Sequence, residues 1–189
     1  MISPAAPTKK LRCNAIAAVV LAAFGLCASP GVHPKTGAAQ ASDLATGSVS
    51  GLPVPRFVSI KASKVNMHVG PGKQYDVSWL YQRAGLPVEI TAEYENWRRV
   101  RDGDGTEGWM YHSMLSGRRS GVVIAKNDAP VPLYDSESRT SAIDAKLAPG
   151  VIAMVKSCNG AWCRVTGDGF EGWVEQSHLW GVYPGEKIN

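Results

Sequence analysis

The sequence predicts an all-β protein made of two tandem, small β-barrels or β-sandwiches. The main observation is that one stretch occurs twice, as WRRVRDGDGTEGWMYHSML at 97–115 and as WCRVTGDGFEGWVEQSHL at 162–179. Each copy holds two alternating apolar and polar runs around an Asp/Gly turn, which is typical of a β-hairpin. The copies lie about one small domain apart, which indicates a tandem repeat. No run of residues predicts a helix of ordinary length, so strands must supply the core.

Repeat one is expected to span 56–119 and to consist of short strands joined by tight turns. The segment 77–81 fits either a strand or an extended loop. Turns are predicted at 70–72, which reads Gly-Pro-Gly, and at the Asp/Gly cluster 102–105. Residues 113–115 predict a single helical turn that closes the unit. The predicted strands are 57–60, 65–69, 86–93, 97–100 and 109–111.

Repeat two is expected to span 120–189 and to follow the same order of elements. Its first strand is predicted at 122–124 and its last at 180–183. The dipeptide Asn159-Gly160 is a strong signal for a hairpin turn and lies between two cysteines. Strands of this length and spacing suit small barrels or sandwiches.

The first 41 residues are predicted to be a signal peptide, so the mature protein is expected in the periplasm or the cell envelope. Basic residues precede a short apolar run at 15–26, and the Ala-Gln-Ala at 39–41 fits a cleavage site. Cleavage near Ala28 is the alternative. The apolar run is too short for a membrane span, and none is expected after cleavage. Residues 42–55 are rich in small and polar residues, which predicts a flexible linker.

The formal net charge of +4 belongs to the leader. Residues 1–41 hold four basic residues and no acidic one, so residues 42–189 carry 16 of each sign. The charge therefore gives no reason to expect nucleic acid as a partner. Five arginines nevertheless make repeat one locally basic, and they could contact carboxylates or merely be solvated: Arg98, Arg99, Arg101, Arg118 and Arg119.

The two cysteines beyond the leader region, Cys158 and Cys163, are predicted to form a disulfide. Export to an oxidising compartment makes a disulfide the default for such a pair. Metal binding needs more ligands, and His178 is the nearest candidate, so no metal and no cofactor are expected. A Cys/His hydrolase would have to pair Cys163 with His178, and no helix is predicted that could lower the pKa of the thiol. We therefore expect a protein that is not an enzyme.

The tryptophan that follows Glu-Gly in each repeat is expected to fill the core of its barrel. A barrel of about sixty residues has a thin core, and one tryptophan can bury about 150–250 Å². We expect Trp109, Trp173 and Trp162 to be core residues. Gly108 and Gly172 precede two of them, where a strand bends or another backbone approaches closely.

Together these motifs resemble the bacterial SH3-like domains of secreted and cell-envelope proteins. Repeat one carries Val-Asn-Met-His at 65–68, Gly-Pro-Gly at 70–72, Trp-x-x-Val at 97–100 and Gly-Trp-Met at 108–110. It departs at His68, where the family usually has Arg. Repeat two keeps the tryptophan motifs but reads Val-Pro-Leu-Tyr at 131–134. The resemblance implies two SH3-like half-open β-barrels that bind cell-wall peptides or proteins.

Exposed aromatic residues are the candidates for a recognition surface, because a thin core cannot hold them all. Two functions remain open. The first is binding of peptidoglycan peptides through the loop 70–81, and the second is interaction with a periplasmic protein, as a scaffold element. The alternative for the aromatic residues is that most of them line the core or the face between the barrels. The candidate ligand-binding residues are Tyr75, Trp79, Tyr81, Trp97, Tyr111 and Arg99.

Overall fold

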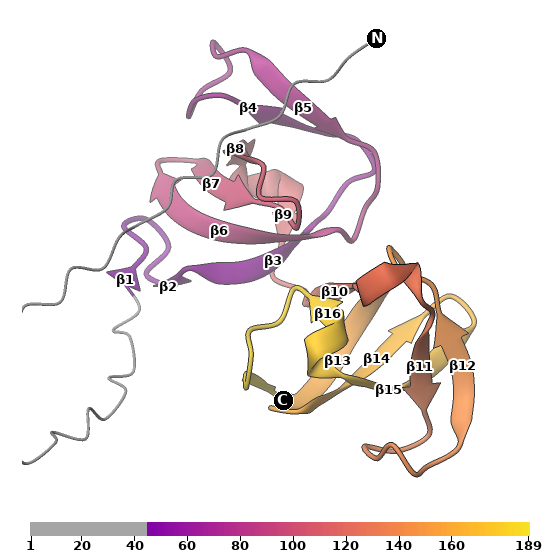
Figure 1. The fold of residues 1–189 in the computed structure, drawn as a ribbon. Helices are drawn as coiled ribbons and strands as arrows, with labels where there is room; N and C mark the ends of the chain where they lie inside the picture. Colours follow the sequence, from indigo (N-terminus) through magenta and orange to yellow (C-terminus); the bar gives the residue numbers. More distant parts are fainter. Residues whose placement is uncertain (1–44) are drawn as a thin grey trace, which may run out of the picture. The chain divides into compact units, whose positions relative to one another are not determined.

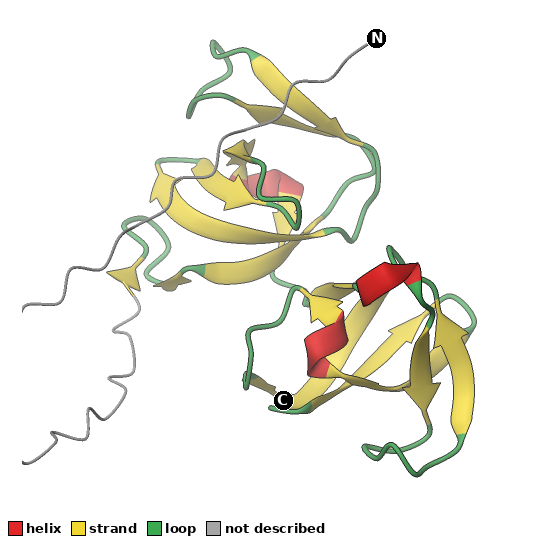
Figure 2. Cartoon of the chain, viewed as in Figure 1, coloured by secondary structure: helices red, strands yellow, loops and turns green. Residues whose placement is uncertain are grey.

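The computed structural model describes residues 45–189 and shows two small β-barrels joined by a short connection (Figure 1). Strands and turns make up this part of the chain, and its helices are single 3-10 turns (Figure 2). The prediction of an all-β protein with two SH3-like barrels is confirmed. The predicted signal peptide and its cleavage site lie outside the described residues. Within residues 45–189, no helix is long and apolar enough to span a membrane.

The first barrel is a seven-stranded antiparallel sheet with the strand order β5-β4-β8-β7-β6-β3-β9. The segment left open between strand and loop is a strand, β5, and it forms one edge of the sheet. The 3-10 turn η1 (His112–Met114) leads into β9, close to the predicted helical turn. The strands are β3 (Arg56–Ile60), β4 (Val65–His68), β5 (Val77–Tyr81), β6 (Pro87–Tyr94), β7 (Trp97–Arg101), β8 (Glu107–Tyr111) and β9 (Leu115–Ser116).

The second barrel repeats this topology in the order β12-β11-β15-β14-β13-β10-β16, and the terminal strand β17 (Lys187–Ile188) adds to β13. The prediction that the last strand spans 180–183 is wrong, because of these residues Trp180 alone lies in a strand, β16, and the last strand is β17. The other strands are β10 (Ser120–Val123), β11 (Val131–Tyr134), β12 (Ile143–Leu147), β13 (Ile152–Asn159), β14 (Trp162–Gly167), β15 (Phe170–Glu175) and β16 (Leu179–Trp180). The 3-10 turns are η2 (Lys126–Asp128) and η3 (Gln176–His178).

The predicted core tryptophans are corrected by the structure. Trp109, Trp173 and Trp162 are half-buried and belong to neither core cluster. The residues that follow the first two, Met110 and Val174, have no exposed surface. Because side chains alternate along a strand, a core position at Met110 puts Trp109 on the other face of the sheet. The cores are therefore built mainly from aliphatic residues and methionine, with Tyr81 in the first and the two cysteines in the second.

The expected close approach at Gly108 and Gly172 is confirmed. A Cβ atom on Gly108 would lie 2.5 Å from Cγ of Met67 and 2.8 Å from the carbonyl oxygen of His68. A Cβ atom on Gly172 would lie 2.8 Å from Cγ of Leu133. Glycine at these positions lets β4 cross β8, and β11 cross β15, at the point where each barrel closes.

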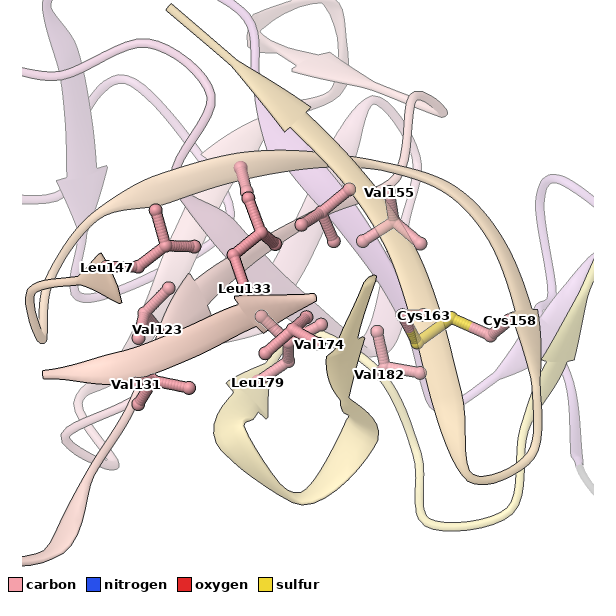
Figure 3. Packing of buried hydrophobic residues seen from close by; sticks show 12 residues of the cluster. Val123, Val131, Leu133, Leu147, Val155, Cys158, Cys163, Val174, Leu179 and Val182 are labelled. Atoms are coloured by element: carbon pink, nitrogen blue, oxygen red, sulfur yellow. A yellow bond between two sulfur atoms is a disulfide. The ribbon is translucent and has the colours of Figure 1, made fainter. Parts of the chain in front are cut away.

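The expected disulfide between Cys158 and Cys163 is present, and it joins β13 to β14 at directly opposed positions. Both cysteines lie in the apolar core of the second barrel with Val155, Val174 and other aliphatic side chains (Figure 3). The disulfide therefore acts as part of the core as well as a covalent link across the hairpin.

The segment expected to be a flexible linker differs from that expectation where it is described. Strands β1 (Ala45–Thr46) and β2 (Pro53–Val54) pair as a hairpin. The carboxylate of Glu93 receives hydrogen bonds from the amide nitrogens of Val49 and Ser50, at 3.0 and 2.8 Å, and from Arg56 at 2.6 Å. The Glu93 side chain has no exposed surface. One buried carboxylate thus fixes the hairpin to β6.

The two barrels belong to one compact unit and contact each other through buried polar groups. Glu89 of the first barrel is 3% exposed and accepts a hydrogen bond of 2.8 Å from the hydroxyl of Tyr183. Ser120 of the second barrel is 1% exposed and donates to the carbonyl oxygen of Gly85 at 2.7 Å. Satisfied buried hydrogen bonds of this kind define one arrangement of the two barrels.

Candidate functional site

The six predicted ligand-binding residues do not form one site. Tyr75, Trp97 and Tyr111 line one hollow of the first barrel. Trp79 and Tyr81 line a second hollow, which residues of both barrels form. Arg99 lines neither and is ion-paired to Glu107 at 2.6 Å.

The first hollow, here called the loop groove, has a volume of about 650 Å³. It lies between the β4–β5 loop, the β6–β7 turn and the end of β8. A volume of this size suits a ligand of a few residues. The residues that line the loop groove are Pro71, Gly72, Lys73, Gln74, Tyr75, Tyr94, Glu95, Trp97 and Tyr111.

The floor of the loop groove is held in place by aromatic contacts. Trp97 is 8% exposed, and its ring meets the rings of Tyr111 and His68 edge to face, with centroids 5.6 and 5.2 Å apart. Nδ1 of His68 lies 2.8 Å from the carbonyl oxygen of Tyr75, within hydrogen-bonding distance. The floor and the loop above it are thus connected through one histidine, at the position where the family usually has Arg.

The rim of the loop groove carries one charge of each sign. Lys73 comes from the β4–β5 loop and Glu95 from the β6–β7 turn. Neither forms an ion pair among the residues that the structure describes. Sequence reasoning missed both residues, together with Tyr94. Tyr94 and Glu95 lie in the short turn between the strands predicted at 86–93 and 97–100. Their position beside Trp97 could have indicated them.

The loops of the two barrels correspond residue by residue. Tyr75 donates its amide hydrogen to the carbonyl of Gly72 at 3.3 Å, and Ser141 donates to Ser138 in the same way at 3.2 Å. The loops begin with equivalent bonds, from Val69 to Asp76 and from Asp135 to Ala142. The resulting equivalences are Pro71 with Glu137, Lys73 with Arg139, Tyr75 with Ser141, Tyr94 with Asn159, Glu95 with Gly160 and Tyr111 with Glu175.

Side chains of the second barrel span the groove that is open in the first. Arg139 donates two hydrogen bonds of 2.6 Å to the two oxygens of Glu175. Asn159 donates to Glu137 at 2.5 Å, from the neighbouring turn to the loop. The hydrogen bonds from Arg139 lower the pKa of Glu175, so this pair stays ionised at neutral pH. A ligand would have to break both bridges to enter.

Most of the basic character expected for repeat one is neutralised within the protein. Arg98, Arg99, Arg101 and Arg119 each pair with a glutamate. Of the five arginines, Arg118 alone has no ion pair within residues 45–189. The diffuse attraction of anions by these arginines is therefore weaker than their number alone would indicate.

The second hollow, here called the interbarrel groove, has a volume of about 510 Å³. Trp79 is 56% exposed on the edge strand β5, whereas Tyr81 is 7% exposed and donates a hydrogen bond of 2.7 Å to Asp102. Burial and this hydrogen bond raise the pKa of Tyr81. Trp180 of the second barrel packs on Gly103, in the predicted Asp/Gly turn. Tyr81 is thus a structural residue, and Trp79 remains a candidate for contact with a ligand.

The residues expected for a Cys/His hydrolase do not form a catalytic pair. Cys163 is fully buried and bonded to Cys158, so it offers no thiolate. Nδ1 of His178 lies 3.3 Å from the carbonyl oxygen of Ile124. Within residues 45–189, no three His, Cys, Asp or Glu side chains are grouped in a way that could hold a metal ion.

Comparison with known families gives one clear match. A family described as "Bacterial SH3 domain" matches residues 61–117 and 127–181. These ranges contain the β4–β5 loop of the first barrel and its counterpart in the second. No protein of curated function matches the sequence.

The solved structures that the chain matches include NlpC2 from Trichomonas vaginalis and an NlpC/P60 family protein from Bacillus cereus. The first is 14% identical, with a TM-score of 0.31, over 67% of this chain and 48% of that one. The second is 12% identical, with a TM-score of 0.30, over 66% of this chain and 55% of that one. The chain thus matches about half the length of these proteins.

Proposed function

We propose that this chain, which belongs to the bacterial SH3 domain family of binding modules, is an exported, non-catalytic protein that binds cell-wall peptides through the loop groove. The observation that carries the proposal is the difference between its two barrels. The same loop and hairpin occur in each, and in the first they line an open groove, whereas in the second the Arg139–Glu175 bridge crosses the equivalent place.

The lining of the loop groove suits a short peptide. The rings of Tyr75, Tyr94 and Tyr111 offer wide, rigid contact areas with polar edges, at little cost in conformational entropy. Lys73 and Glu95 supply charges for a ligand that carries both signs. The disulfide fits an oxidising compartment, which supports export.

The test transfers the bridge from the second barrel to the first. The double variant Lys73→Arg/Tyr111→Glu places an arginine and a glutamate at the positions of Arg139 and Glu175. The purified protein is sedimented with purified sacculi at low and at moderate salt, so that diffuse charge attraction is separated from specific retention. We expect wild type to be retained at moderate salt and the double variant to remain in the supernatant.

A matched control makes the same change of charge elsewhere. Lys146→Arg/Ile143→Glu alters exposed residues of β12 in the second barrel, and its retention should equal that of wild type. Circular dichroism confirms that each variant is folded. If wild type fails to sediment at either salt concentration, wall binding is excluded, and equal retention of the double variant would remove the loop groove as the site.

A second function, docking of a periplasmic protein, is favoured by the exposed edge of the first barrel. Val77, Trp79 and Leu80 of β5 are 49%, 56% and 44% exposed. The equivalent edge strand β12 carries charges instead, at Asp144 and Lys146. Charges on an edge strand discourage pairing with other chains, and an apolar edge permits it. Cross-linking from position 77 of the same strand, in the periplasm, would identify such a partner, and Trp79→Lys should abolish the cross-link.

A further inference from the structure

The backbone of Glu95 adopts a conformation that is costly for its residue type. Its φ angle is 46°, in the left-handed region. Among residues 45–189, the other non-glycine residues with positive φ are Asn127 and Asp128, whose side chains tolerate this region. Gly160 stands at the equivalent position of the second barrel, with φ at 103°. The hairpin therefore favours glycine here, and the first barrel has glutamate.

The surrounding structure holds Glu95 in this conformation. The guanidinium of Arg98 donates a hydrogen bond of 2.9 Å to the carbonyl oxygen of Glu95 and also pairs with the buried carboxylate of Glu93. Arg98 itself is 8% exposed. Local strain that is fixed by its neighbours is often found at sites of function.

The carboxylate of Glu95 makes no contact that would explain its presence structurally. No hydrogen bond or ion pair to its side chain occurs within residues 45–189, and the residue is exposed. It lines the loop groove beside Tyr94 and Trp97. A contact made by the Glu95 side chain in the loop groove could therefore offset the free-energy cost of its backbone conformation.

We infer that Glu95 binds a free ammonium group of the peptide ligand, and that Lys73 binds a carboxylate of the same ligand. This inference rests on the proposed function and specifies its ligand class as peptides with a free side-chain amine. A carboxylate against aromatic rings is a good site for an ammonium group, because both attract a cation. Cross-linking converts such an amine into an amide, so the loop groove selects wall peptides that are not cross-linked.

The second barrel agrees with this assignment. It lacks the carboxylate at the turn, because its residue is Gly160, and its loop cation, Arg139, is bound to Glu175. The second barrel therefore lacks the negative charge that a zwitterionic ligand needs, and its positive charge is already paired. In the first barrel Tyr111 replaces Glu175, which leaves Lys73 and Glu95 available.

The experiment measures binding of two synthetic peptides to the full protein by calorimetry. The first is N-acetyl-Ala-γ-D-Glu-Lys-D-Ala, in which the lysine side chain carries the one free amine, and the second is the same peptide with that amine acetylated. We expect wild type to bind the free amine about tenfold more tightly. Glu95→Gln should remove this preference, whereas Asp104→Asn, which changes an exposed carboxylate outside the loop groove, should keep it.

The stability of a second variant tests the conformational argument. Glu95→Gly introduces the residue of the second barrel and should raise the melting temperature by about 2–4 °C while removing the preference for the free amine. An unchanged or lower melting temperature would overturn the argument from strain. Equal binding of both peptides by wild type would overturn the inference and leave peptide binding intact. If neither peptide binds, the proposed function fails with it.

Discussion

Glu93 and Arg98 face each other across β6 and β7, with Oε1 and Nε 3.3 Å apart, at the register positions that the disulfide occupies in the second barrel. The two barrels thus join the same hairpin by different chemistry, an ion pair in one and a covalent bond in the other. The covalent bond does not respond to moderate acid, but the carboxylate of Glu93 does. This difference makes the first barrel the one that acid should affect.

Acid should release the β1–β2 hairpin from the first barrel. Burial alone would raise the pKa of Glu93, but hydrogen bonds from Ser50, Arg56 and Val49 outweigh it and lower the pKa from 4.5 to about 2. A lowered pKa adds stability above pH 4.5, which is lost as the pH falls through about 2. The contribution is on the order of 3 kcal/mol. Urea unfolding between pH 6 and pH 2 measures it, and Glu93→Gln should flatten this pH dependence.

Removal of the Tyr183 hydroxyl should loosen the contact between the barrels. Tyr183→Phe deletes the hydrogen bond to the buried Glu89 and should cost about 1–2 kcal/mol in urea unfolding. Tyr94→Phe is the matched control, because Tyr94 is 51% exposed. Burial and the hydrogen bond to Glu89 raise the pKa of Tyr183 above its usual 10. The stabilisation by the Tyr183 hydroxyl is therefore present below pH 10 and lost at higher pH. The difference in stability between wild type and Tyr183→Phe should change at alkaline pH, whereas that between wild type and Tyr94→Phe should not.

Loss of the disulfide should destabilise the second barrel alone. Cys158→Ala/Cys163→Ala removes a link that closes a short loop. The unfolded chain then gains conformational entropy, which should lower the free energy of unfolding by an amount on the order of 2 kcal/mol. Hydrogen exchange should show faster opening of β13 and β14, with β6 and β7 unchanged. Faster exchange throughout both barrels would contradict the expectation that the link acts locally.

A methyl group at the closure of the first barrel should be poorly tolerated. Gly108→Ala would place its Cβ 2.8 Å from a backbone oxygen, that of His68, so the strands must move apart. The expected cost is about 1–3 kcal/mol or more in thermal unfolding. Gly117→Ala is the control, because a Cβ there meets no atom within 4 Å. Equal melting temperatures for the two variants would contradict the register of β8.

The sequence predicted the strands and the disulfide well, because these depend on local alternation and on spacing. It misplaced the tryptophans because alternation alone does not tell which face of a strand is inside. Trp109 and Met110 are adjacent and both apolar. The larger side chain, that of Trp109, was predicted to be in the core, but Met110 is the buried one. Only the crossing of β4 over Gly108 decides that Met110 points inward.

The residues of the candidate site were identified in part, for a related reason. Tyr75, Trp97 and Tyr111 were recognised as aromatic candidates, and they do line one groove. Lys73 and Glu95 were missed, because a charged residue in a turn is ordinarily a solvated one. The hairpin on Glu93 was missed since its bonds span more than forty residues of the sequence, and no local pattern announces such a contact.

The bridge between Arg139 and Glu175 has a consequence for valency. Among residues 45–189, a ligand of the proposed site would find one open groove, because the equivalent place in the second barrel is filled by the protein's own side chains. Arg139→Lys/Glu175→Tyr would remove the bridge, and Gly160→Glu, Asn159→Tyr and Ser141→Tyr would supply the other groove residues of the first barrel, so the five changes together should create a bivalent protein. On a polymer that presents the same peptide many times, two linked places can raise avidity by about 10²–10⁴-fold. The filled groove of the second barrel would thus favour a protein that releases such a polymer readily over one that stays attached.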